Sequence, residues 1–217
     1  ALLARGPSFR MSAEMVRDNA LAISGLLSPK IGGPSVYPYQ PEGLWDEISN
    51  KPWRYKYLQQ SGEGLYRRSL YTIWKRTSGP PSMLIFDVGE RGVCTVKRRQ
   101  TSTPLQALVL LNDPQYLEAS RVVAENLMAD YSGNVDVQLQ KAFVMCTGRN
   151  PSDTELGVLS KFHAEELKRF TEAKEDAIAY TRIGSSEVKA GLDPVSLAAL
   201  ATVINGVMNT YEGYTIR

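Results

Sequence analysis

Apolar residues recur at helical spacing through the second half of the chain, and a capping signal precedes each periodic segment. Residues 135–147 follow the i, i+3, i+4, i+7 pattern of an amphipathic helix, whose apolar face consists of Leu139, Ala142, Phe143 and Cys146. A similar face follows Asp193-Pro194 and consists of Leu197, Leu200, Ala201, Ile204 and Met208. The pattern predicts long amphipathic helices that bury one side in a common core.

Capping residues predict further helices. Thr103-Pro104-Leu105-Gln106 and Ser152-Asp153-Thr154-Glu155 have the spacing of capping boxes, and the second predicts a helix to about residue 170. Asp113-Pro114 places a capping carboxylate before a proline at the first helical position, which predicts a helix to about residue 130. Ser12 predicts a helix to about Leu26, which Ser28-Pro29 ends. These starts predict a mainly α fold, an irregular helical bundle over residues 104–217 with little β structure.

Residues 28–64 differ from the rest, because prolines and glycines interrupt every stretch long enough to form a long helix. Aromatic residues are interleaved with them, and aromatics at this density usually pack, so we expect an ordered loop excursion. The mixed pattern of residues 69–74 fits either a short strand or a helical turn. We expect residues 1–217 to form one domain, a fragment of a larger multidomain protein. Residues 1–103 are its loop-rich, basic and aromatic part.

Composition narrows the class of protein. With 43% hydrophobic and 22% charged residues among 217, the chain has the composition of a folded protein, and its net charge of +2 does not favour nucleic acid as a partner. No apolar run approaches the length of a membrane span, and the first ten residues do not resemble a signal peptide. Cys94 and Cys146 fit either one disulfide or two thiols. Because no Cys-x-x-Cys-His or zinc-ligand pattern occurs, we expect neither haem nor metal in this chain.

Basic residues concentrate between residues 66 and 103, a segment that contains eight Lys or Arg residues and two acidic residues. Guanidinium groups beside aromatic rings suit an anion, held by bidentate hydrogen bonds, or a sugar, which stacks on an aromatic face. The candidate ligand-binding residues are therefore Arg67, Arg68, Tyr71, Trp74, Lys75, Arg76 and Asp87, with the turn at Gly32 and Gly33 facing them. The alternative is that buried arginines tie loops together through backbone carbonyls and that the aromatics fill the core.

Other candidates have weaker patterns. Asp87 fits a general acid or base, although an ion pair with Arg67 or Arg76 is the commoner role for such a residue. Glu14 fits a proton-transfer group, a polar edge toward the basic segment or a solvated helix face. His163 is the single histidine, and its Glu- and Lys-rich surroundings predict a surface position. The glycine turn at residues 30–35 lacks the spacing of a phosphate-binding loop, which favours a tight backbone turn.

Several blocks, taken in order, resemble one known family. They are RMSAEMVRD at residues 10–18, SGLL at 24–27, KIGGPSV at 30–36, LYRRSLYT at 65–72 and TPLQALVLLNDP at 103–114. As a set these blocks resemble the C-terminal domain of unknown function of planctomycete-type cytochrome proteins, and the resemblance covers nearly the whole chain. It implies an exported or periplasmic parent protein in the cell envelope. It also implies upstream domains, commonly including one that carries haem c, as partners of this chain.

Three hypotheses follow for function. The first is a module that binds an anionic or carbohydrate ligand in a cleft between the basic segment and the glycine turn. The second is part of a carbohydrate-active or redox enzyme, with Asp87 or Glu14 as the proton-transfer group, a reading that the family context alone suggests. The third is a structural scaffold, in which the arginines are internal supports.

Overall fold

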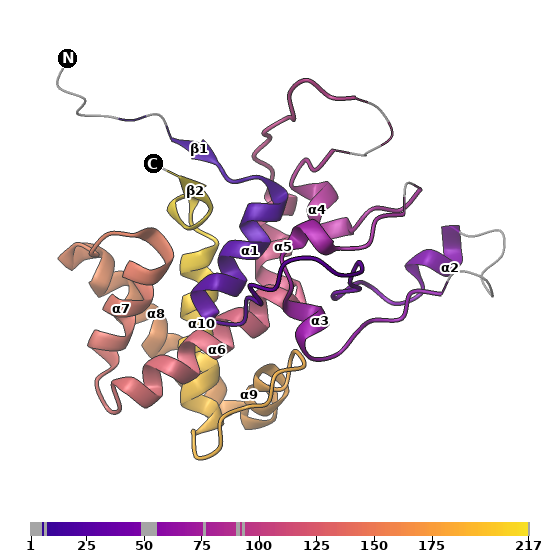
Figure 1. The fold of residues 1–217 in the computed structure, drawn as a ribbon. Coiled ribbons are helices and arrows are strands. Elements are labelled where there is room, and N and C mark those ends of the chain that lie inside the picture. Colours follow the sequence, from indigo (N-terminus) through magenta and orange to yellow (C-terminus); the bar gives the residue numbers. More distant parts are fainter. Residues whose placement is uncertain are drawn as a thin grey trace.

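Helices dominate the fold, and the mainly α class predicted from the sequence is confirmed (Figure 1). The computed structural model describes residues 6, 8–48, 56–75, 77–89, 92 and 94–216. In chain order the elements are β1 (Phe9–Arg10), α1 (Ala13–Ser24), α2 (Leu44–Ile48), α3 (Glu63–Tyr66), the 3₁₀ turn η1 (Ser69–Tyr71), α4 (Pro81–Ile85), α5 (Pro104–Asn112), α6 (Pro114–Asp130), α7 (Val135–Thr147), α8 (Asp153–Glu172), α9 (Lys174–Thr181), α10 (Pro194–Met208), η2 (Tyr211–Tyr214) and β2 (Thr215–Ile216).

The predicted capping signals open the helices as expected. Thr103 and Ser152 form capping boxes at the starts of α5 and α8, and the carboxylates of Asp113 and Asp193 cap α6 and α10. Ser12 caps α1, which ends two residues earlier than predicted. The helix stops there because Gly25 adopts a left-handed φ of 78°, a conformation that terminates helices.

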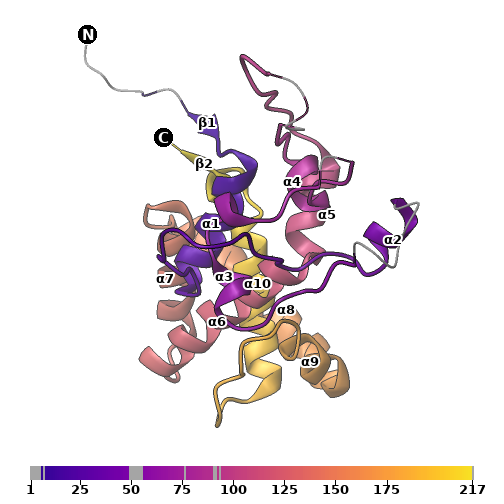
Figure 2. The same ribbon diagram turned by 45° about the vertical axis from the view of Figure 1, so that its right-hand side comes forward.

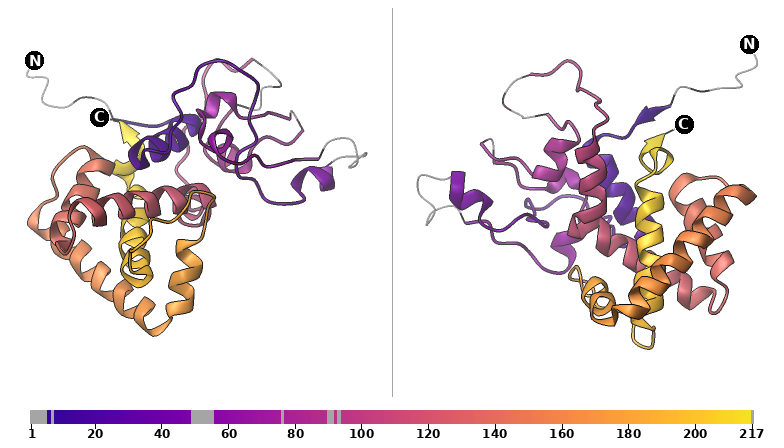
Figure 3. Two further views of the ribbon diagram at one scale, coloured as in Figure 1. Left: turned by 60° about the horizontal axis from the view of Figure 1, so that its bottom comes forward. Right: turned by 180° about the vertical axis from the view of Figure 1, so that it is seen from behind.

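The apolar α10 forms the centre of the bundle, and α6, α7, α8 and α9 pack around it (Figure 3). The core of this part contains Leu197, Leu200 and Ile204 of α10, each at most 1% exposed. They meet side chains of α6 and α7, among them Val123, Leu139 and Phe143. The faces predicted from helical spacing are therefore the buried ones.

A second apolar cluster lies where α1, α4, α5 and the beginning of α6 meet, and it includes Val16, Met83, Phe86, Leu110 and Tyr116. β1 and β2 pair antiparallel beside it, which brings residues 9–10 next to residues 215–216. This short sheet is the only one among the described residues. Two-residue strands carry too little pattern to be predicted from sequence.

The loop excursion predicted for residues 28–64 is present over the described residues 28–48 and 56–64, and the part of it that carries α2 projects from the body of the molecule (Figures 1 and 2). We call residues 37–48 and 56–60 the arm. Tyr37, Trp45 and Tyr57 pack edge to face in it, with ring centroids 5.1–6.3 Å apart. Tyr37 and Gln60 join its two sides through a 2.9 Å backbone hydrogen bond, in which Gln60 donates. The undecided residues 69–74 begin as the 3₁₀ turn η1.

Both cysteines are free thiols, with Cys94 exposed and Cys146 buried, so the disulfide alternative is not realised. None of the helices in the described part of the chain combines the length and apolar character that a bilayer crossing requires.

Candidate functional site

One residue of the basic segment, Arg67, contacts the glycine turn, and it stabilises the backbone of that turn through hydrogen bonds. Arg67 is 4% exposed, and its terminal nitrogens donate to the carbonyl oxygens of Gly32 at 2.5 Å, Lys30 at 3.2 Å and Pro34 at 3.3 Å. Its guanidinium also lies 3.9 Å from the centre of the Tyr71 ring, and the Tyr71 hydroxyl accepts a 2.8 Å hydrogen bond from the Gly32 amide. Both terminal nitrogens of Arg67 are thus occupied by the protein's own backbone.

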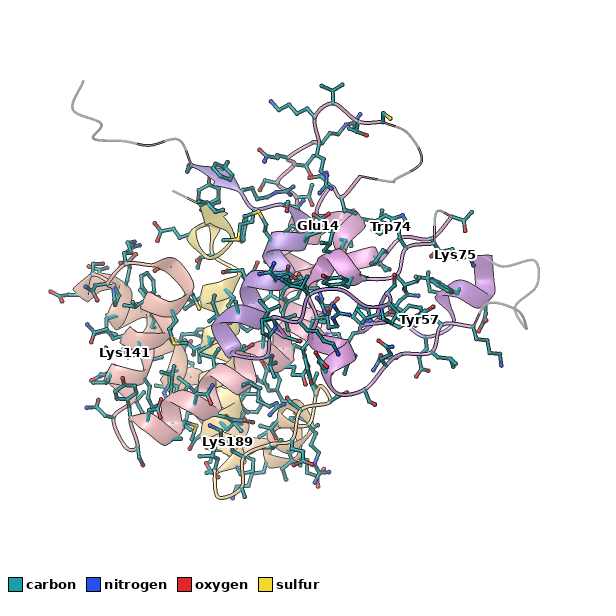
Figure 4. All side chains as sticks on the ribbon, viewed as in Figure 1. Glu14, Tyr57, Trp74, Lys75, Lys141 and Lys189 are labelled. Carbon is teal, nitrogen blue, oxygen red and sulfur yellow. The ribbon has the colours of Figure 1, made fainter. Side chains whose placement is uncertain are left out.

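The remaining predicted ligand-binding residues do not converge on one cleft. Arg68 is exposed, whereas Trp74 is half-buried and packs against the cluster around Phe86. Lys75 lies against the arm, with its ammonium 5.0 Å from the centre of the Trp45 ring. Figure 4 shows Lys75 and Tyr57 on the α2 side of the molecule, away from Lys141 of α7. Arg76 lies outside the described residues, so its predicted role stays a prediction.

The two predicted proton-transfer groups are both engaged in ion pairs. Asp87 accepts hydrogen bonds from Arg10 and from the backbone amide of Thr101, each at 2.8 Å. Burial alone raises the pKa of Asp87, but the bonds from Thr101 and Arg10 outweigh it and lower the pKa. Glu14 pairs with Arg98 at 2.7 Å, and its pKa is likewise lowered by that pair against the effect of burial. Groups held ionised in this way are poor proton donors at neutral pH.

The surface position predicted for His163 is wrong. Its side chain is 8% exposed, because it shares the inner face of α8 with Phe170, seven residues further along. Burial lowers the pKa of His163, so the imidazole is held neutral inside the bundle.

A cleft of about 550 Å³ lies between the arm, α4 and the junction of α5 with α6, within the size range of small-molecule sites. The arm contributes one wall through residues 39–42 and Gln59. The other wall is made by Pro81, Ser82 and Ile85 of α4 and by Leu108, Val109, Asn112, Asp113 and Pro114. A second hollow of about 400 Å³ adjoins it and shares Gln40, Pro41, Glu42 and Gln59. The same stretch of the arm therefore lines both hollows.

Glu118 of α6 holds the arm wall of the cleft in place. Its carboxylate is 1% exposed and accepts hydrogen bonds from the hydroxyls of Tyr39 at 2.9 Å and Tyr66 at 2.8 Å. It also accepts the backbone amides of Ser185 at 2.8 Å and Ser186 at 2.7 Å, which lie in the loop before α10. One buried carboxylate therefore joins the arm, α3 and the bundle, and it fixes Tyr39 against the cleft.

Asp113 is the most constrained polar residue of the cleft. Its Oδ1 caps α6 by accepting the Gln115 amide at 3.0 Å, and it accepts the Gln115 side-chain nitrogen at 3.2 Å. The Gln115 carbonyl in turn accepts a hydrogen bond from Nε of Arg17, which is 1% exposed. Burial raises the pKa of Asp113, although the Gln115 bonds and the charge of Arg17 act in the opposite direction.

The polar groups of the cleft are acids and amides. Among the described lining residues two are acidic, Glu42 and Asp113, and none is basic. Gln40, Gln59 and Asn112 add amide groups, which both donate and accept hydrogen bonds. The Gln40 side-chain nitrogen is shielded from solvent and has no hydrogen-bond partner among the described residues. Such a lining fits an uncharged ligand rich in hydroxyl groups, and it does not fit an anion.

Sequence reasoning did not find this cleft. The sequence pattern predicts Asp113 only as a helix cap, and it places Gln40 and Glu42 in the loop excursion without indicating a site. The arm, α4 and the junction of α5 with α6 contribute lining residues that lie 22 to 75 positions apart in the sequence, so no local spacing signals the site. Among the described residues, no group of three or more His, Cys, Asp or Glu side chains is arranged to hold a metal ion.

Comparison with known proteins identifies a family without assigning an activity. The family model described as PSD1, protein of unknown function (DUF1553), matches residues 1–163, so the chain belongs to this family. The resemblance inferred from the sequence blocks is thereby confirmed at the level of this family of unknown function and over residues 1–163. Neither the curated proteins nor the solved structures that were compared contain a significant match to the chain.

Proposed function

We propose that this member of the PSD1 family is a carbohydrate-binding module that takes an uncharged stretch of a polysaccharide in the cleft beside Asp113. The observation that carries the proposal is the lining of the cleft, which combines amides, carboxyls and apolar faces with no basic group among its described residues. Sugar hydroxyls are matched by groups that both donate and accept, and sugar C–H faces are matched by apolar surfaces such as Tyr39, Pro41 and Pro81.

The shape of the site favours a chain over a single sugar. The adjoining hollow continues along the arm past Gly43 and Leu58, with Tyr57 as a further aromatic surface. An extended ligand would therefore contact both hollows through the residues they share. The resemblance to exported, cytochrome-associated proteins supports a periplasmic or cell-envelope location for the parent protein, where polysaccharides are abundant.

The choice of a neutral ligand departs from the anion hypothesis. The guanidinium that lies at the glycine turn, that of Arg67, already donates to three carbonyl oxygens. Arg67 instead supports the scaffold hypothesis for the basic segment, since it ties a loop in place through backbone carbonyls. Arg10, which lies outside that segment, acts in the same way. A scaffold of this kind is compatible with a binding site elsewhere in the chain.

The test is affinity electrophoresis and calorimetry of the 217-residue chain against neutral polysaccharides and sulfated glycans, at low and high salt. We expect binding of a neutral polysaccharide that salt leaves unchanged, because no ion pair contributes. Gln40→Ala should weaken it about fivefold, the effect of losing one hydrogen bond of about 1 kcal/mol. The control, Arg68→Ala on the exposed surface, should bind like the wild type. Binding of sulfated glycans alone, lost in Arg68→Ala and at high salt, would overturn the proposal, and so would absence of any glycan binding.

A further inference from the structure

We propose that the cleft also hydrolyses the polysaccharide it binds, with Asp113 as the group that protonates the glycosidic oxygen and Glu42 as the carboxylate that activates water. The inference rests on the proposed function, because it needs a saccharide in the cleft. It adds an activity and assigns two residues that sequence patterns did not connect. Glu42 belongs to the arm and Asp113 to the junction of α5 and α6, so folding alone brings both into one cleft.

Asp113 is oriented as a proton donor requires. Gln115 occupies Oδ1 with two hydrogen bonds, and the buried Arg17 holds the Gln115 carbonyl from behind. Oδ2 has no hydrogen-bond partner among the described residues, which leaves this oxygen to carry the proton and to meet a ligand. A side chain whose rotamer is fixed by such a supporting chain is pre-organised for proton transfer.

The surroundings of Asp113 disfavour its charged form. Val109, Ile85 and Pro114 line the cleft together with it, and apolar neighbours disfavour the charged carboxylate. The pKa of Asp113 is accordingly raised by burial. Glu42, in contrast, is exposed on the rim of the cleft. Two carboxyl groups in different environments are the arrangement by which glycoside hydrolases separate the acid from the base.

The reaction balances with water as the only co-reactant. The proton of Asp113 Oδ2 moves to the glycosidic oxygen as the bond between that oxygen and the anomeric carbon breaks. Water attacks the anomeric carbon and gives one proton to the Glu42 carboxylate. Transfer of a proton from Glu42 to Asp113 through solvent restores both groups, and the products are two shorter saccharides.

Asp113 offers an unusually clean test, because asparagine caps helices as well as aspartate but cannot donate an acid proton. The assay measures new reducing ends released from the polysaccharide that the wild-type chain binds. We expect Asp113→Asn to keep the unfolding midpoint and the saccharide affinity while turnover falls at least about 100-fold. Glu42→Gln should also lower turnover. The matched control is Asp193→Asn, at the cap of α10, where the carboxylate accepts the Ser196 amide outside the cleft.

The outcomes separate this inference from the proposed function. Saccharide binding without release of reducing ends by the wild type would overturn hydrolysis and leave binding intact. Turnover that survives in Asp113→Asn, or that falls equally in Asp193→Asn, would remove Asp113 from the reaction. If no polysaccharide binds, the proposed function fails first and the inference fails with it.

Discussion

Removal of the Glu118 carboxylate tests how the cleft is attached to the bundle. Glu118 accepts four hydrogen bonds, from the hydroxyls of Tyr39 and Tyr66 and from the amides of Ser185 and Ser186. In Glu118→Ala all four donors lose their acceptor. A buried donor without a partner costs about 1–3 kcal/mol, and because the space left by the side chain can admit water, we take the lower value for each. The free energy of unfolding should fall by about 4 kcal/mol.

Glu118→Gln should be much milder. The amide oxygen can still accept from Tyr66 and from the two backbone amides, and the Tyr39 hydroxyl can turn to accept from the new NH₂ group. What is lost is the extra strength of hydrogen bonds to a charged acceptor, so we expect a loss of about 1–2 kcal/mol. Burial and the neighbouring Glu118 carboxylate raise the pKa of Tyr66, so its hydroxyl remains a donor throughout the accessible pH range.

Urea unfolding followed by tryptophan fluorescence and far-UV circular dichroism measures these differences. Glu165→Ala is the control, because this glutamate is 63% exposed and its ion pair within the described residues is a 4.0 Å contact with Lys161. A surface pair of this kind contributes less than about 1 kcal/mol. If Glu118→Ala unfolds within 1 kcal/mol of the control, or if Glu118→Gln is as damaging as alanine, the network does not anchor the arm as described.

Three further changes test other parts of the structure by simple measurements. Gly184→Ala should destabilise the chain by at least about 2 kcal/mol in urea unfolding, because Gly184 has φ +99° and a Cβ there would lie 2.4 Å from Glu118 Cδ. Since the folded-state pKa of His163 is lowered by burial, the unfolded chain binds the extra proton and stability falls from pH 7 to pH 5; His163→Gln should flatten that dependence in the same assay. A thiol reagent should modify exposed Cys94 within seconds to minutes and reach buried Cys146 only on unfolding, which mass spectrometry can follow.

Local signals predicted the helices well, because a cap and the helix it opens lie within a few residues. The capping boxes at Thr103 and Ser152 are read from four residues each and are present as predicted. The sequence does not predict α9, because no local capping signal marks its start. It starts after Ala173, which has no capping side chain, and its charged sequence lacks a clear apolar face. Tertiary packing against α10, rather than a local signal, holds it as a helix.

The site was not predictable in the same way, because its walls are made by contacts between distant segments. Charge counting did locate an unusual segment, but whether Arg67 meets a ligand or a carbonyl depends on where the turn at residues 30–34 lies in space. The structure places that turn directly over its guanidinium. Asp113 looked like an ordinary cap, and only the arm on the other side turns it into part of a cleft.

Backbone carbonyl groups find their hydrogen-bond donors in different ways in the two halves of this fold. In the bundle, helices satisfy their own carbonyls. In the loop-rich half, carbonyls near the core need outside donors, and buried guanidinium groups provide them: Arg17 donates to the carbonyls of Leu65 and Arg67, and Arg10 to those of Phe86 and Thr101. The chain itself therefore occupies these two guanidinium groups, whereas other basic residues of this half, such as Arg68, are exposed. Within the cleft, the Gln40 amide nitrogen and Oδ2 of Asp113 have no hydrogen-bond partner among the described residues. A ligand that forms hydrogen bonds with both groups is the one that the proposed function predicts.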